Sequence, residues 1–135
     1  MERNSTPQAN EEVGYLVVKV STARGAIPLE NAAVSIRGSS PENSDVIYSL
    51  TTNSDGITEK VSLPAPARAL SEKPGTASPF SRWNVDVFKD GYIPVTFQNV
   101  PVYASIVSVQ PAVLVPAPEN FRGSVIYNES GTPNL

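Results

Sequence analysis

The stretch that decides the fold is WNVDVFKDGYIPV, residues 83–95. Its first half alternates apolar with more polar residues, which is the period of a strand that buries one face. Asp90-Gly91 then supplies turn chemistry, because this pair tolerates the positive φ of a tight hairpin. We therefore expect a strand, a turn with Gly91 at positive φ and the start of a second strand, with Tyr92 folded back over the hairpin. Trp83 is the only tryptophan of the chain, so we expect a core centre here.

The same short alternation recurs along the chain. Strands are expected at 15–20, 32–37, 46–52, 57–63, 83–89, 94–99 and 105–115. Glycine, proline, asparagine and aspartate punctuate the gaps, as in the Asn53–Gly56 turn, and no stretch is typical of a long helix. Pro94 lacks a backbone donor and so belongs at a strand start or on a sheet edge, and Pro111 indicates a sheet edge or a bulge. We predict an all-β fold, a seven-stranded antiparallel Greek-key β-sandwich.

The domain organisation follows from where apolar residues stop. Residues 1–13 are polar and are expected to form a disordered tail, and residues 117–135 a flexible one with a single apolar patch, Val125–Tyr127. That patch adds a strand, docks a partner or frays, and we expect it to fray. The sandwich is then 14–116, interrupted by a proline-rich loop at 64–81 that is long for a compact domain.

Composition narrows the chemistry. The 135 residues carry a net charge of −3 and a pI of about 4.9, so no general attraction to nucleic acid or to an anionic membrane surface is expected. Neither cysteine nor histidine occurs, which excludes disulfides and thiolate sites and removes the usual general base near neutral pH. No apolar run approaches the ~20 residues of a membrane helix, and the N-terminus lacks the apolar segment of a secretory signal. We expect no catalysis, no cofactor, no metal and no membrane insertion.

The carboxylates fit this expectation. A glycosidase needs a pair of carboxylates across a cleft, and calcium needs clustered oxygen ligands. Asp55 and Asp90 each precede a glycine, so a turn role explains them. Asn53, Asp55 and Glu59 are too few for a predicted calcium site.

Three motifs resemble carboxypeptidase regulatory-like domains. The similar segments are GYLVVKV (14–20) with IPLENAAVSI (27–36), the TTNSDG hairpin (51–56), and VDVFKDGY (85–92). The resemblance spans about 14–115 and implies the transthyretin-like, or prealbumin-like, seven-stranded sandwich. Asn31 stands where those domains often have glycine, and asparagine tolerates the left-handed conformation.

A bacterial subgroup of these domains is more similar still. The shared stretches are ARGAIPL (23–29), LPAP (63–66), GYIPV (91–95) and NVPV (99–102). In spore-forming bacteria such domains accompany spore-cortex-lytic and peptidoglycan-associated proteins. The resemblance implies a non-catalytic accessory module in a spore or cell-envelope setting; without it, the missing signal would indicate the cytoplasm. No ligand follows from it.

The candidate interaction surface is the proline-rich loop and its end. Its residues are Pro66, Arg68, Phe80, Arg82 and Trp83. An aromatic ring beside a basic group stacks on a sugar or grips a peptide, so the expected partner is a protein or peptidoglycan. The competing interpretation makes Trp83 a core residue and the loop a plain surface excursion. Because prolines guard its edges, the sandwich is expected to be a monomer in dilute solution.

The alternative function is structural, a spacer or stalk that holds a separate functional domain. Related sandwiches of bacterial surface proteins carry a Lys–Asn isopeptide bond formed with a buried acid. By that resemblance Lys19 and Asp86 would be the lysine and the acid. The last expected strand has no asparagine, and Asn99 lies one strand too early.

Overall fold

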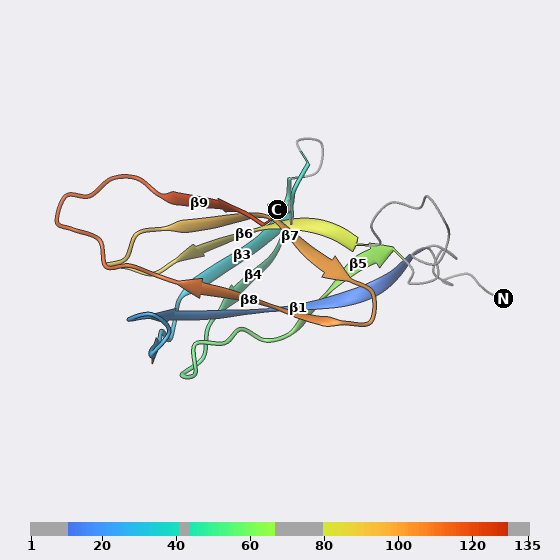
Figure 1. Ribbon diagram of the computed structural model, residues 1–135, viewed down its shortest axis with the longest axis horizontal. Helices are drawn as coiled ribbons and strands as arrows, with labels where there is room; N and C mark the ends of the chain where they lie inside the picture. Colours follow the sequence, from blue (N-terminus) through green and yellow to red (C-terminus); the bar gives the residue numbers. More distant parts are fainter. Residues whose placement is uncertain (1–10, 41–43, 67–79, 130–135) are drawn as a thin grey trace.

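All regular elements in the described residues, 11–40, 44–66 and 80–129 of a computed structural model, are β-strands (Figure 1). They are β1 (Glu11–Thr22), β2 (Ile27–Pro28), β3 (Ala33–Gly38), β4 (Val46–Thr51), β5 (Val61–Pro66), β6 (Phe80–Phe88), β7 (Val95–Tyr103), β8 (Val107–Val113) and β9 (Val125–Asn128). The strands form two facing sheets, and the all-β sandwich expected from the sequence is confirmed.

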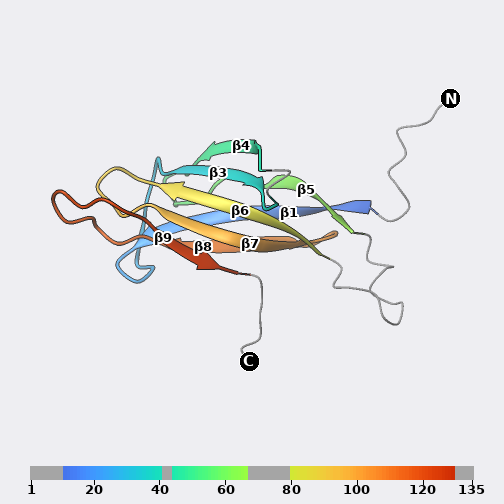
Figure 2. The same cartoon turned by 90° about the horizontal axis from the view of Figure 1, so that it is seen from above.

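The four-stranded sheet is organised around β1. Tyr15 of β1 is paired with Ser62 of antiparallel β5 on one side and with Val107 of parallel β8 on the other. The five-stranded sheet has the order β4-β3-β6-β7-β9, which Figure 2 shows as successive ribbons. Its last pair, β7 with β9, is also parallel. The expectation of seven strands in purely antiparallel pairing is therefore wrong, because β1 and β7 each accept a distant strand in parallel on an edge that hairpins leave open.

The stretch expected as the fourth strand, 57–63, pairs later than predicted. The Thr58 hydroxyl accepts the backbone N–H of Val18 at 3.0 Å, where a regular ladder would use a carbonyl. This side-chain bond interrupts the pairing with β1, and the ladder continues only from Val61, opposite Leu16. β5 consequently runs to Pro66, into what the sequence indicated was a loop.

Pro64 and Pro66 fit in β5 because β5 is an edge strand. The carbonyls of Ser62 and Pro64 point away from β1 and accept side-chain hydroxyls from the facing sheet, Tyr48 at 2.8 Å and Ser81 at 2.7 Å. The nitrogens of the prolines lie on this same free edge, where no ladder bond is lost. The predicted 64–81 loop is corrected at both ends, since 64–66 belong to β5 and 80–81 to β6. Residues 67–79 lie outside the described part of the chain.

Both predicted tails contain strand. β1 begins at Glu11, where Glu11, Glu12 and Val13 pair with the end of β5. The expected fraying of the C-terminal patch is wrong, because Val125–Asn128 form β9 beside β7. The ring of Tyr127 stacks on Phe97, with 5.5 Å between centroids, and this apolar contact gives a short strand a reason to order.

The core lies between the sheets, and Trp83 belongs to it. Leu16, Val18, Ile36, Val85 and further inward-facing residues are fully buried, and Trp83 is 9% exposed. Its indole Nε1–H donates to the Ser81 hydroxyl at 2.8 Å, which in turn donates to the Pro64 carbonyl. A buried tryptophan needs such a partner for its N–H. The two successive hydrogen bonds connect β6 with β5 across the sandwich. The core interpretation of Trp83 is confirmed.

The alternation in β6 is broken by an irregularity that the sequence did not reveal. Between Trp83 and Val85 the β7 partner strand carries one extra residue, and Asn99 there has a φ of 61°. The buried side chain of Asn84 accepts the backbone N–H of Asn99 at 3.0 Å. The extra residue in β7, with Asn99 at positive φ and its N–H bonded to a side chain, is a β-bulge. A bulge increases the local twist of the strand pair.

The opening hairpin has the predicted turn. Gly91 has a φ of 91°, and the Tyr92 N–H donates to the Lys89 carbonyl at 3.0 Å. Tyr92 is partly buried and packs against the core. The turn role of Asp90-Gly91 is thus confirmed.

Candidate interaction surface

The structure separates the residues predicted as one interaction surface. Trp83 is buried in the core, Pro66 ends β5 opposite Glu11, and Arg68 lies outside the described residues. Phe80 and Arg82 stay at the surface, at the start of β6. Among the described members of the predicted surface, Trp83 is therefore the one that is not available to a ligand.

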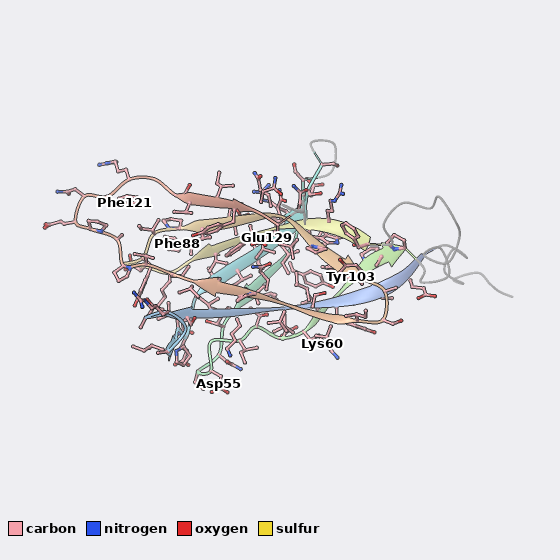
Figure 3. All side chains as sticks on the ribbon, viewed as in Figure 1. Asp55, Lys60, Phe88, Tyr103, Phe121 and Glu129 are labelled. Carbon is pink, nitrogen blue, oxygen red and sulfur yellow. The ribbon has the colours of Figure 1, made fainter. Side chains whose placement is uncertain are left out.

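Phe80 and Arg82 belong to a small aromatic cluster with Tyr103 of β7. The rings of Phe80 and Tyr103 lie 5.3 Å apart at a tilt of 44°, and the Arg82 guanidinium lies 5.2 Å from the Phe80 ring centre. Residues two apart on one strand share a face, which explains the second contact. Figure 3 labels Tyr103, close to the turn that leads into β8.

An apolar surface that the sequence did not assign covers the outside of the four-stranded sheet. On β8, Gln110, Ala112 and Leu114 point inward and are buried, so the alternate residues face out. Their pairing partners Tyr15 and Val17 on β1 add to the same surface, and the exposed charged residue Lys19, the partner of Pro111, borders it. We call this the outer apolar face; it consists of Tyr15, Val17, Val107, Val109, Pro111 and Val113. Val107 and Val109 are 48% and 57% exposed.

A groove of about 400 Å³ borders the outer apolar face. Ser108, Val109, Gln110 and Pro111 of β8 form one wall, and Val100, Pro101 and Tyr103 of β7 form the other, with Glu129 at the end of β9. Tyr103 thus connects the groove to the Phe80–Arg82 cluster. Tyr103 and Glu129, both labelled in Figure 3, mark two ends of this region.

The one ion pair found within the described residues lies on the outer side of the five-stranded sheet. Arg37 of β3 donates to Asp86 of β6 at 2.7 Å, and the Thr96 hydroxyl donates to the same carboxylate at 2.6 Å. Burial alone would raise the pKa of Asp86, but the hydrogen bonds from Arg37 and Thr96 outweigh it and hold the pKa below its ordinary value.

This placement is incompatible with the isopeptide crosslink. Asp86 is engaged with Arg37 on the outside of the five-stranded sheet, whereas Lys19 is exposed on β1 of the other sheet. An acid must lie beside both reacting groups to transfer their protons, and these two residues lie in different sheets.

The depressed pKa of Asp86 makes a pH-dependent contribution to stability. Because the folded pKa lies below the ordinary 3.8, the contribution is present above that value and is lost as the pH falls through the folded pKa. We expect Asp86→Asn to destabilise by about 1 kcal/mol or less at pH 7, since the pair is partly exposed. Urea unfolding at pH 7 and pH 2 checks this: the gap between wild type and variant should be smaller at pH 2 than at pH 7. The exposed turn variant Asp90→Asn is the control, and a gap of equal size at both pH values would contradict the prediction.

Asp55 and Asp90 both lie in turns, as predicted from the glycine that follows each of them. The Asn53 side-chain oxygen accepts the backbone N–H groups of Asp55 and Ile57 at 2.9 and 3.0 Å, so it shapes the hairpin. Within the described ranges, no group of three or more His, Cys, Asp and Glu side chains comes together that could hold a metal ion. The same ranges contain no helix able to cross a membrane.

Comparison with solved structures establishes the fold class. The Bacillus anthracis TIE protein matches with a TM-score of 0.51 and 15% identity, over 78% of this chain and 17% of that chain. Catechol 1,2-dioxygenase from Acinetobacter sp. ADP1 matches with a TM-score of 0.51 and 14% identity, over 93% of this chain and 61% of that one. The fold is a β-sandwich. The chain spans less than two thirds of either protein, and at such identities the similarity concerns the fold alone.

A type II cohesin–X-dockerin complex from Acetivibrio cellulolyticus matches with a TM-score of only 0.41, at 17% identity, over 81% of this chain and 59% of that one. No protein-family profile and no curated protein sequence matches the chain.

Proposed function

We propose that this chain is a non-catalytic interaction module that binds a protein through its outer apolar face. The observation that supports this most directly is the row of exposed valines on β8, where Val107, Val109 and Val113 are about half exposed. The outward side of a sheet in contact with water normally alternates polar residues with the buried ones. A contiguous apolar surface beside a groove is typical of a contact site.

The chemistry of the face favours a protein over a sugar. Branched aliphatic side chains bury area well against another apolar surface, and they offer no hydrogen bonds to a glycan. The valines lie on a rigid sheet, so little side-chain freedom is lost on binding.

The setting of the module rests on resemblance. The motifs shared with carboxypeptidase regulatory-like domains of spore-forming bacteria support an accessory role in a spore or cell envelope. In such a protein a second domain would carry the activity. A partner-free spacer is the alternative, and it predicts that the outer apolar face binds nothing.

The test compares a triple variant of the outer apolar face with a control double variant on β4. Val107→Thr, Val109→Thr and Val113→Thr together remove the apolar character while keeping shape and strand preference. Val46→Thr with Ile47→Thr makes the same change on β4, at residues that are also exposed. Proteins retained from a spore-envelope extract by the wild-type chain should be lost from the β8 variant and kept by the β4 variant. Equal retention by all three folded chains would sink the proposal.

A second candidate function rests on the Phe80–Arg82–Tyr103 cluster. A partly exposed ring with a cation beside it is suited to a sugar ring or to the peptide stem of peptidoglycan. Immobilised peptidoglycan fragments test it, with Phe80→Ser and Arg82→Ser as variants. Binding that these variants abolish and the β8 triple variant leaves intact would favour the cell wall as the ligand.

A further inference from the structure

The free edge of β8 is the surface that allows the partner to be described further. β8 is paired with β1 along one side only, and no strand among the described residues covers its other side. The groove lined by Val109, Pro111 and Tyr103 opens along this second side. A sheet edge that borders a groove is the arrangement in which extended peptides add a strand.

The pairing with β1 determines which backbone groups of β8 face outward. The ladder begins where the Tyr15 N–H donates to the Ile106 carbonyl and ends where the Leu114 N–H donates to the Ser21 carbonyl. In a parallel ladder alternate residues carry the bonds, so even-numbered residues of β8 serve β1. The N–H and C=O groups of Val107 and Val109 therefore point along the free edge.

Pro111 marks the end of this free edge. Pro111 is one of the odd-numbered β8 residues, whose backbone groups point away from β1. The missing N–H of proline therefore costs no hydrogen bond to β1. Its carbonyl accepts the Gln110 side chain at 2.9 Å, so both of its backbone groups are closed to a partner. The open part of the edge is short, from Val107 to Val109, which disfavours pairing of two whole β8 strands.

We propose that the protein partner adds an extended peptide strand to the β8 edge at Val107 and Val109, with a basic side chain in the groove beside Glu129. This inference rests on the proposed function and specifies its partner. In an added strand alternate side chains point to opposite sides, so one set enters the groove and the other covers the outer apolar face. Glu129 lies at the groove, and a lysine or arginine there complements its charge.

The test uses fluorescein-labelled synthetic peptides of about nine residues, a usual strand length, in which valine and lysine alternate. Two derivatives carry backbone N-methyl groups on either the odd or the even residues. In an added strand the backbone N–H groups of only one set of alternate residues face β8. The derivative methylated on that set should bind ~10-fold or more weakly, while the affinity of the other derivative changes little. Anisotropy titration of the full chain measures this difference. Equal weakening by both derivatives, or no binding of the parent peptide, overturns strand addition.

Two variants of one residue separate backbone pairing from side-chain packing. Val109→Pro removes an outward N–H without touching the β1 ladder, and Val109→Ala trims the side chain while keeping the N–H. Strand addition predicts that the proline variant binds the peptide ~5-fold or more weakly than the alanine variant. Equal affinities overturn it. Melting temperatures confirm that both variants are folded.

The charge at the groove is tested by reversal. Glu129→Lys should weaken the lysine peptide and strengthen a peptide of valine alternating with glutamate, whereas Glu119→Lys, an equal charge change in the exposed loop before β9, should do neither. Identical effects of the two variants overturn the groove assignment.

The outcomes also distinguish this inference from the proposed function. If peptides fail while the β8 threonine variant still loses its envelope partners, strand addition is wrong and the interaction module stands. If light scattering shows a dimer that Val109→Pro disrupts, the occupant of the edge is a second copy, which likewise overturns the peptide.

Discussion

Trp83→Ala is expected to lower the free energy of unfolding by about 3–5 kcal/mol, a large part of the stability of an ordinary domain. The indole is 9% exposed within the core between the sheets, so its removal leaves a cavity. It also removes the donor to Ser81, in the hydroxyl chain that reaches Pro64 of β5. Urea unfolding monitored by circular dichroism measures the loss. Phe88→Ala, which truncates a half-exposed aromatic on the same strand, is the control and should cost little.

Fluorescence provides an independent check of Trp83, because the chain has no other tryptophan. A buried indole should emit at short wavelength and resist quenching by iodide. If emission is red-shifted and readily quenched, or if Trp83→Ala keeps the melting temperature but abolishes binding to a wall glycan, Trp83 is a ligand platform and the core assignment is wrong.

Gly56→Ala is expected to destabilise by about 2–4 kcal/mol, because two costs add at one position. Gly56 has a φ of 77°, and a Cβ there would meet the Val20 carbonyl oxygen at 2.4 Å. That contact is with backbone, which cannot rotate away. The Gly56 carbonyl also accepts the Val20 N–H at 2.7 Å, so a shift would weaken the end of β1.

Gly91→Ala is the matched control for Gly56. Gly91 has a comparable φ of 91°, but a Cβ built there meets nothing within 4 Å. Only the conformational cost remains, about 1 kcal/mol. Chemical denaturation of both variants should therefore separate backbone strain from steric contact. Equal losses would show that the close approach to Val20 contributes nothing.

Local signals predicted much of the fold. The alternation around Trp83, the Asp-Gly turn and the spacing of short apolar segments indicated strands, and the class of sandwich followed. These features depend on neighbours along the chain, so they can be recognised without knowing the partner strand. Pro111 was likewise interpreted as an edge residue, and it lies on the free edge of β8.

Long-range pairing was beyond the sequence. The inward residues of β8 include the polar Gln110, whereas the exposed ones are mostly valines, so alternation alone would have assigned the valines to the buried side. Likewise, Val125–Asn128 orders because β7 presents an open edge and Phe97 a ring to stack on. The bulge at Asn99 depends on the Asn84 side chain fifteen residues away.

By itself the amino-acid sequence determined the all-β class and the turn at Gly91, because these depend on local backbone preference and on the spacing of apolar side chains along the chain. Between a core role and a surface role for Trp83, the structure decided for the core. Only the tertiary structure decided that β8 lies parallel to β1, that its valines form an outer face, and that Val107 and Val109 turn their backbone groups to the free edge of the sheet. The register between two strands is set by contacts over long sequence separations, and a shift of one residue would have exchanged the buried and the exposed sides of β8.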